Sequence, residues 1–302
     1  WSLKFRRSDV QRVVKLMVPR SLDQGIDQIH YIVETIIASR LQVGSLAIYY
    51  FANNLKNVPL VLIGNSVATA AFPTMASRAA KGAYETLIKE FVINARLILF
   101  LVVPAAIVTV IMRGYIVRLL YGFGDPTTAN TLGWFAGAII FQALFFLVAR
   151  MFYALQDSKT PLYVSVSAII INIPLSIGLS NEFGVVGLAM AQSVLAVLEV
   201  VVLTILLQRR MEQIGLESIW AGLWRMLLAG AIMIGSTYIV VARVMPLYAT
   251  DLGFIVVAPK FFGILAISLA AYFIPCYLLD LHEARKVYGK LKEQILKPLN
   301  LT

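Results

Sequence analysis

The feature that most constrains this chain is a series of long apolar segments. Each holds about 20 mostly apolar residues, which is the length that a helix needs to cross the hydrocarbon core of a bilayer. The 302 residues are 60% hydrophobic and only 14% charged, whereas soluble domains are about 25% charged. The composition excludes an ordinary soluble domain and a disordered chain, and it predicts an all-α, polytopic membrane protein. About eight spans are expected near 17–39, 45–74, 91–112, 129–153, 161–180, 184–208, 224–245 and 254–279.

The basic residues predict how these spans are oriented. The net charge is +10, and Lys and Arg are concentrated in the cytoplasmic loops of membrane proteins. If the first span starts in the cytoplasm, the basic residues near both ends and within 78–89 and 209–210 all lie inside. Both ends of the chain are then cytoplasmic, which requires an even number of spans. The segment 113–121 is too short and too basic to cross, so we expect a short interfacial helix there.

The first span carries a polar face that lipid cannot solvate. At 100 degrees per residue, Arg20, Asp27, His30 and Glu34 fall within an arc of about 80 degrees that also includes Asp23. A charge near the bilayer centre costs about 2.5–3.5 kcal/mol even on lenient scales. We therefore expect this face to line a wet cavity, where Asp27, His30 and Glu34 would couple transport to an ion. The alternative is a set of interhelical hydrogen bonds or an internal ion pair that only stabilises the bundle.

The second span is polar on one side and interrupted near its middle. Asn53 and Lys56 share a face, and Pro59 and Gly64 follow. Such an interruption frees backbone carbonyls and serves either as a hinge in a transporter or as a static kink. Lys56 is a candidate for binding an anionic group, or else it extends outward to the membrane surface.

Two later spans add oxygen-bearing side chains. Asn172 and Ser176 lie one turn apart in the fifth span, and Gln192 lies in the sixth. If they approach Glu34 or Asp27, these groups would supply oxygen ligands for sodium or a path for protons. Polar residues that only pack between helices are the alternative. Glu199 is close to the expected cytoplasmic end of its span and is interpreted as interfacial.

The sequence contains no motif for enzymatic chemistry. The glycine-rich nucleotide loops, the GxSxG nucleophile turn and the HExxH metal motif are all missing. Cys276 is the only cysteine, which excludes an internal disulfide and a cysteine-based metal cluster. We expect a transporter rather than an enzyme or a nucleic-acid-binding protein, with no cofactor other than a possible sodium or proton coupling. Because the chain opens at Trp1 without an initiator Met, we also expect an upstream part to be missing.

Two blocks of sequence resemble a known family. The stretch IYYFANNLKNVPLVLIGNSVATAAFPTMASR (48–78) resembles the YA-x-x-L-x-x-x-P … G … TA-x-x-P-x-x-S signature of the MurJ/MviN lipid II flippases. FYALQDSKTP and FGVVGLA, within 150–189, resemble a second block of that family. With RVVKLMVP and IIASRL near the N-terminus, the similarity covers the first six spans and is weaker over the last two.

The resemblance implies a fold and an activity. Members of this family, within the multidrug/oligosaccharidyl-lipid/polysaccharide exporter superfamily, have two six-helix lobes around a central cavity and two further helices that form a groove for a lipid tail. By resemblance, residues 1–210 are the C-terminal lobe, and 211–302 are the two additional helices with a basic cytoplasmic tail. The implied function is alternating-access flipping of lipid II, a peptidoglycan precursor with a diphosphate-sugar head, across the bacterial inner membrane.

One motif departs from the family pattern. The family usually reads YADRL where this chain reads FANNL, so Asn53 and Asn54 replace an Asp-Arg pair. Lys56 lies about 160 degrees around the helix from Asn54, which predicts that it is a poor substitute for the lost cation. Arg20 and Lys56 remain candidates for holding the anionic head, with Asn53 and Asn54 beside them. Asp157 and Lys159 match a loop motif that we interpret as structural.

Other functions fit the same residues. An exporter of a different polyprenyl-diphosphate-linked sugar, or of cationic drugs, would use the same superfamily fold. The acids of the first span leave drug export open, whereas the two extra C-terminal spans and the FYALQDSKTP block weigh against it. A membrane scaffold that has lost transport is a further alternative, which the Asn53-Asn54 pair favours. The expected partners are the lipid-linked cargo, membrane lipids and the missing N-terminal lobe.

Overall fold

A computed structural model provides the fold of this chain. The structure describes residues 25, 28–122, 124–211, 214–248, 251, 253–285 and 289. Every regular element in these ranges is helical, which confirms the all-α expectation. Seven helices of the described ranges are long and apolar enough to cross a membrane. The first expected span, 17–39, lies partly outside the described residues, and its described part is helical over 28–39.

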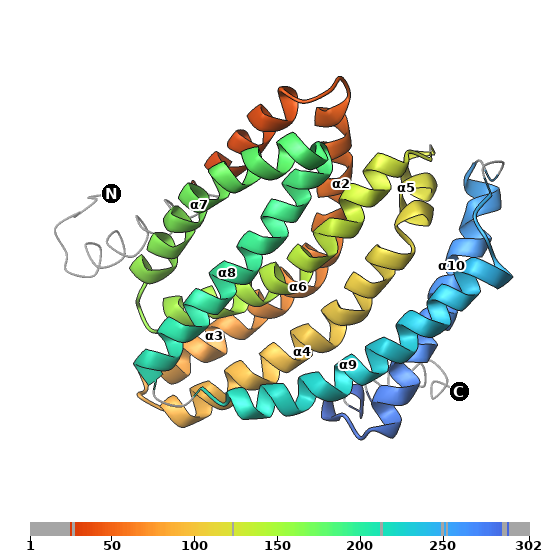
Figure 1. The fold of residues 1–302 in the computed structure, drawn as a ribbon. Helices are drawn as coiled ribbons and strands as arrows, with labels where there is room; N and C mark the ends of the chain where they lie inside the picture. Colours follow the sequence, from red (N-terminus) through yellow and green to blue (C-terminus); the bar gives the residue numbers. More distant parts are fainter. Residues whose placement is uncertain are drawn as a thin grey trace, which may run out of the picture.

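The helices follow one another with short connections (Figure 1). The elements are α2 (Ser45–Pro59), η1 (Leu60–Asn65), α3 (Ser66–Ala80), α4 (Tyr84–Ile111), α5 (Arg113–Tyr121), α6 (Pro126–Ala154), α7 (Lys159–Phe183), α8 (Val185–Met211), α9 (Leu216–Ile239), η2 (Val240–Val244) and α10 (Phe254–Leu278).

The helices extend further than their apolar segments do. We expected the charged stretch 77–90 to separate two spans, but α3 continues through Ala80 and α4 begins at Tyr84. Charged residues at a membrane surface are solvated and can remain helical, so hydropathy marks the end of the apolar segment rather than the end of the helix. Arg78 and Glu90 form an ion pair of 2.8 Å across this turn, which joins the two helix ends.

The short helix expected at 113–121 is present as α5 (Arg113–Tyr121). Gly122 ends it in the left-handed conformation, with φ of 74°, which glycine adopts without steric cost. Asp125 then starts α6 by accepting hydrogen bonds from the backbone N–H groups of Thr127 and Thr128, and Pro126 occupies the first turn. An acidic N-cap followed by proline is a strong start signal for a helix.

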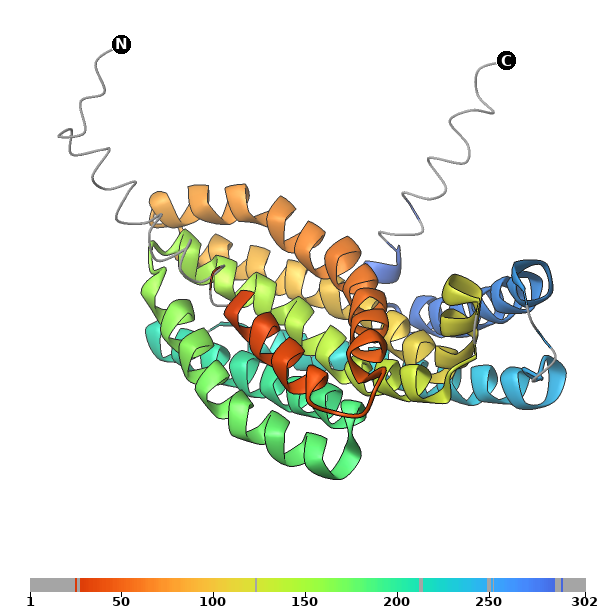
Figure 2. The ribbon, with the colours of Figure 1, turned by 90° about the horizontal axis from the view of Figure 1, so that it is seen from above.

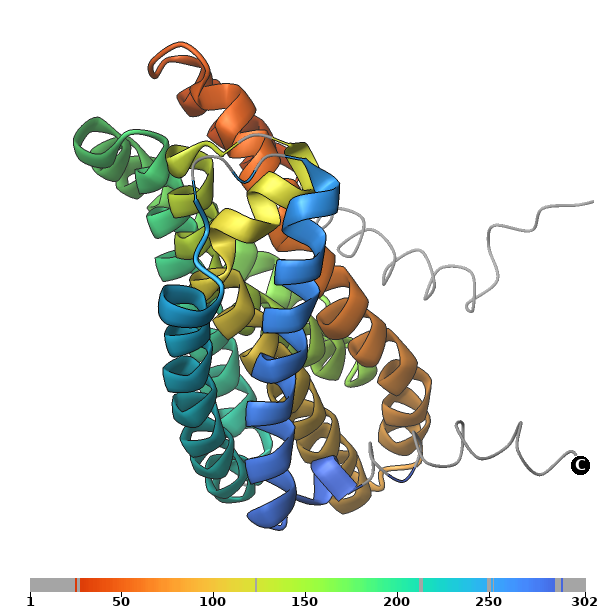
Figure 3. The same ribbon diagram turned by 90° about the vertical axis from the view of Figure 1, so that its right-hand side faces the viewer.

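Helix α6 is the centre of the bundle. It packs against α2, α3, α4 and α8, whereas α7 packs mainly on α8. On the other side, α9 packs on α4, and α10 packs on α9 (Figures 1 and 3). Seen from above, the helical segment 28–39 lies beside α7 (Figure 2). This arrangement places segment 28–39, α2, α6 and α8 around one polar region.

The second span is interrupted where the sequence predicts it. Pro59 ends α2, and the following turn η1 is π-helical, because proline has no N–H to donate to the preceding turn. Gly64 lies in η1, where a Cβ atom would be only 2.7 Å from the Cβ of Ala143 on α6. The close approach of the two helices therefore requires glycine at this position.

The last two helices are attached to the bundle at both ends. At one end, Arg96 of α4 donates to Glu283 over 3.1 Å. At the other end, Arg118 of α5 donates to the carbonyl oxygen of Tyr248 over 2.5 Å, and Lys260 forms an ion pair of 2.7 Å with Asp251. The two arginines therefore join the segments that follow η2 and α10 to α5 and α4, whereas the Lys260–Asp251 pair lies within the C-terminal unit itself.

Candidate functional site

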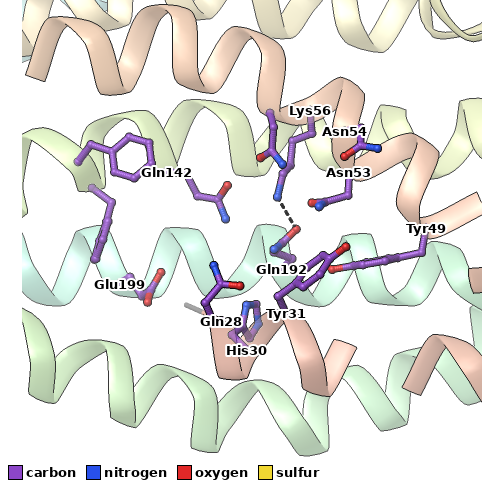
Figure 4. Close-up of a pocket in the computed structure, with 13 residues that line it drawn as sticks. Gln28, His30, Tyr31, Tyr49, Asn53, Asn54, Lys56, Gln142, Gln192 and Glu199 are labelled. Carbon is purple, nitrogen blue, oxygen red and sulfur yellow. Dashed lines mark hydrogen bonds between the residues drawn. The ribbon is translucent and has the colours of Figure 1, made fainter. Parts of the chain in front are cut away.

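A polar cavity of about 420 Å³ opens between segment 28–39, α2, α6 and α8. Figure 4 shows its side chains converging on a shared space from these four helices. Three of the predicted substrate-binding residues, Asn53, Asn54 and Lys56, line this cavity. The complete lining is Gln28, His30, Tyr31, Tyr49, Asn53, Asn54, Lys56, Asn57, Gln142, Phe145, Phe146, Gln192 and Glu199.

Lys56 is held at the wall of the cavity by a buried amide. Its side chain is 3% exposed, and its Nζ donates to Oε1 of Gln192 on α8 over 2.8 Å (Figure 4). The same Nζ lies 4.9 Å from the centre of the Phe135 ring, a cation–π contact. Lys56 therefore does not extend outward to the membrane surface, which excludes one of the two alternatives for it in this structure.

The helical wheel separates Lys56 from Asn54 on α2, and both residues line the cavity. One expectation about a cavity residue needs correction. Glu199 was interpreted as interfacial, but it also lines the cavity. The α8 helix continues to Met211, so Glu199 lies three turns inside the helix rather than near its end.

A buried carboxylate lies beside the cavity. Glu34 has no exposed surface, and its Oε1 accepts hydrogen bonds from Nδ2 of Asn172 over 2.6 Å and from Oγ of Ser176 over 2.9 Å. His30 Nε2 lies 2.6 Å from Asn172 Nδ2 and 3.5 Å from Glu34 Oε1. The structure thus brings together four of the five residues predicted for ion coupling.

The same group contains two oxygens without donors. Glu34 Oε2 and Asn172 Oδ1 are buried and accept no hydrogen bond from the described part of the chain. Buried polar atoms are normally hydrogen-bonded, because an unpaired buried acceptor is energetically unfavourable. A proton or a cation bound at these two oxygens would remove that cost. Carboxylate, amide and hydroxyl oxygens are ligands suited to small hard cations. No cluster of three His, Cys, Asp or Glu residues that could bind a metal occurs in the described ranges.

The remaining predicted residues lie elsewhere. Arg20 and Asp27 are outside the described residues. Pro59 precedes the π-helical turn and Gly64 lies within it, and neither residue lines the cavity. Gln192, which we considered as a further oxygen ligand of the Glu34 group, bonds to Lys56 instead.

Several cavity residues were not predicted from the sequence. Gln142 is the clearest case, because it is the only amide in the apolar stretch 136–150 of α6, and an isolated amide within a membrane span is itself a signal. Phe145 and Phe146 carry no such signal, since aromatic side chains are common on lipid-facing surfaces as well.

Comparisons with known proteins agree with these observations. A family model described as lipid II flippase MurJ matches residues 1–258. A probable lipid II flippase MurJ of Thermotoga maritima is 28% identical over 220 residues, covering 70% of this chain and 46% of that protein. A probable lipid II flippase MurJ of Bdellovibrio bacteriovorus is 26% identical over 289 residues, covering 92% of this chain and 54% of that protein. The chain spans about half the length of these curated relatives.

A solved structure has the same fold. A lipid II flippase MurJ in an inward closed conformation superimposes with a TM-score of 0.66 at 17% identity, over 87% of this chain and 55% of that one. The match to the family model runs through the helices that carry the cavity and the Glu34 group. This multi-pass membrane chain belongs to the lipid II flippase MurJ family.

Proposed function

We propose that this chain is one lobe of a transporter that moves lipid II outward across the bacterial inner membrane by alternating access. The observation that carries this proposal is the polar cavity of about 420 Å³ within a bundle of membrane-spanning helices. A cavity of this kind gives a hydrophilic head group a path through the membrane interior. We infer that a second lobe faces this wall, and that the protein is a transporter rather than an enzyme.

The cavity residues have different proposed roles in binding the head group. Asn53 and Asn54 present their amides to the cavity, and Lys56 acts from behind them by fixing the orientation of Gln192. Lys56 is therefore a positioning residue in this proposal. We assign Arg20 to the diphosphate, because a guanidinium forms paired hydrogen bonds with phosphate oxygens.

The Glu34 group is proposed as the coupling site. Glu34, Asn172 and Ser176 would hold a sodium ion or a proton, with His30 at the border to the cavity and Asp27 as a further acidic residue. The two unpaired buried oxygens support this role. A bound cation would neutralise Glu34 and satisfy both oxygens, so occupancy would change how segment 28–39 packs on α7. The interrupted second span, with Pro59 and Gly64, is proposed as the hinge.

The last two helices are proposed to hold the lipid tail. We divide the chain into a transporter lobe, 1–210, and a two-helix unit, 211–302. An apolar cavity of about 350 Å³ lies between α4, α6 and α9, and it is lined by side chains such as Val103, Ile107, Leu227 and Ile234. A polyprenyl chain would be solvated by these side chains while the head group crosses. We place both ends of the chain in the cytoplasm, following the basic residues.

Reconstitution tests the proposal. The complete protein in proteoliposomes is expected to move labelled lipid II from the inner to the outer leaflet, measured by access of a membrane-impermeant reagent to the head group. A folded protein that moves no lipid II would overturn the proposal. Movement of other lipid-linked sugars by the same preparation would then favour a different cargo.

A further inference from the structure

Carboxamides dominate the wall of the cavity. Of the thirteen lining residues, six are amides and come from all four surrounding helices (Figure 4). An amide group offers two N–H donors and a carbonyl oxygen with two lone pairs. The surface therefore presents many hydrogen-bonding groups and little net charge. The six amides are Gln28, Asn53, Asn54, Asn57, Gln142 and Gln192.

The charged groups of the described lining do not form an anion site. Lys56 is buried and already donates to Gln192, and Glu199 brings the opposite charge to the same wall. His30 faces Asn172 and Glu34. A diphosphate is normally bound by arginine and lysine groups that reach its oxygens directly. This wall is suited instead to an uncharged polar group.

Some hydrogen-bonding groups of these amides are not used by the described residues. Gln142 Oε1 is buried and accepts no hydrogen bond within the described chain. Gln192 uses its Oε1 for Lys56, which leaves the two N–H donors of its amide for other partners, and the residue lines the cavity. Asn54 is exposed and Asn57 is partly exposed to the cavity. Unused donors and acceptors at fixed positions indicate a ligand that can both donate and accept.

Aromatic rings complete the wall. Phe145 and Phe146 line the cavity next to Gln142, with ring centres 6.5 Å apart, and Tyr31 lines it from segment 28–39. Aromatic rings provide flat apolar surfaces. The C–H face of a sugar ring is apolar as well, whereas its edge carries hydroxyl groups that both donate and accept. The amides match the hydroxyl groups of a sugar, and the aromatic rings match its apolar face.

We propose that this wall is a neutral subsite that binds the sugar of the lipid-linked head group through Asn57, Gln142 and Gln192. The subsite rests on the proposed flippase function, and it narrows that function by assigning the sugar, rather than the diphosphate, to this wall of the cavity. The carboxamides select the sugar, and the aromatic rings support its apolar face.

Two ligands separate the subsite from a phosphate site. Binding of lipid II, and of a polyprenyl diphosphate that carries no sugar, is measured to the complete protein in nanodiscs. The near-isosteric variants Gln142→Met and Asn57→Leu are each expected to bind lipid II about three- to tenfold more weakly, the effect of losing one hydrogen bond. Their affinity for the sugar-free lipid should stay within about twofold of wild type. Retained binding of that lipid also shows that each variant is folded.

Asn181→Leu is the matched control. Asn181 is an exposed amide near the end of α7 that does not line the cavity, so this variant should bind both lipids as wild type does. Equal weakening for both lipids in Gln142→Met and Asn57→Leu, or no weakening for either, would overturn the subsite while leaving the flippase proposal intact. Wild-type protein that binds neither lipid would overturn the flippase proposal and the subsite together.

Discussion

Asn172 on α7 donates its amide to the buried carboxylate of Glu34 over 2.6 Å, which joins two helices that are far apart in the sequence. The same carboxylate oxygen also accepts from Ser176, one turn further along α7. Both contacts use Oε1, and Oε2 accepts no hydrogen bond from the described part of the chain. The two contacts orient the carboxylate through Oε1, and the proposed coupling site places the cation or proton at Oε2.

Sodium should stabilise the protein through this group. A ligand that binds only the folded state stabilises it by about 2.7 kcal/mol at a concentration of one hundred times its Kd. We expect added sodium chloride to raise the melting temperature of the wild-type protein in detergent by a few degrees more than choline chloride does. Glu34→Gln should abolish this difference, because the amide carries no charge.

Glu182→Gln provides the control for this measurement. Glu182 is an exposed carboxylate near the end of α7, and its loss should leave the sodium effect unchanged. An equal sodium effect in the wild type and in Glu34→Gln would contradict sodium binding at Glu34. If sodium does not change the melting temperature of any of the three proteins, sodium binding at Glu34 is contradicted. Protonation of Glu34 is then the remaining form of ion coupling.

Lys56 and Gln192 should show strong coupling in stability. Gln192→Leu leaves a buried ammonium without its acceptor, and losing the partner of a charged group costs about 1.5–3 kcal/mol. Lys56→Met removes the charge together with its desolvation cost, so the double variant Lys56→Met/Gln192→Leu should be more stable than Gln192→Leu alone. Chemical denaturation of the four proteins gives the coupling energy. Additive effects of the two substitutions would contradict the contact.

The close approach of η1 to α6 can be tested by exchanging a methyl group between them. In Gly64→Ala the new Cβ would lie 2.7 Å from Ala143 Cβ, and such overpacking typically costs about 1–3 kcal/mol. Ala143→Gly in the same chain should restore most of the lost stability. Gly178→Ala is the control, because a Cβ at Gly178 meets no atom within 4 Å. Thermal unfolding that is unchanged in Gly64→Ala would show that the two helices are further apart than described.

Asp157 should contribute stability that depends on pH. Burial of this carboxyl group raises its pKa, but hydrogen bonds from Thr160 and the guanidinium of Arg210 outweigh that effect, so its pKa lies below the ordinary value. The ionised form is favoured in the folded protein, and its contribution is present above the unfolded pKa of about 3.9. It is lost as the pH falls through the lower, folded pKa. The stability advantage of wild type over Asp157→Asn should therefore shrink below about pH 4.

The measurement is the melting temperature of wild type and Asp157→Asn between pH 7 and pH 3. Asp280→Asn controls for acidic conditions, because Asp280 pairs with Arg285 at an exposed position where both side chains are more than 60% accessible, and such pairs contribute little. A difference between wild type and Asp157→Asn that grows as the pH falls would contradict the assignment.

Much of the fold could be predicted because membrane spans have a strong signal. The apolar segments, the short helix 113–121 and the interruption at Pro59 are local features that the sequence carries directly. Helix ends were predicted less well, as at 77–90, because charged residues remain helical outside the hydrocarbon. The exact ends depend on capping and turn contacts, such as the ion pair of Arg78 with Glu90.

Only those features of the site that depend on the sequence of a single helix could be predicted. The polar face of the first span and the pair Asn172 and Ser176 could be recognised separately, and their expected approach is present around Glu34. Which partner each residue takes depends on how helices pack. Gln192 could equally have joined Glu34, but the position of α8 places it against Lys56. The position of Gln142 in the cavity wall could not be predicted, because it depends on which side of α6 faces the cavity.

The most direct test of the account is the initial rate of lipid II translocation by the complete protein in proteoliposomes, with an imposed sodium or proton gradient and without one, for wild type and Glu34→Gln. We predict that the wild type translocates lipid II faster with one of the gradients, and that Glu34→Gln loses this response while remaining folded. A wild-type protein that moves no lipid II, or a Glu34→Gln protein that responds to the gradient as wild type does, would contradict the account.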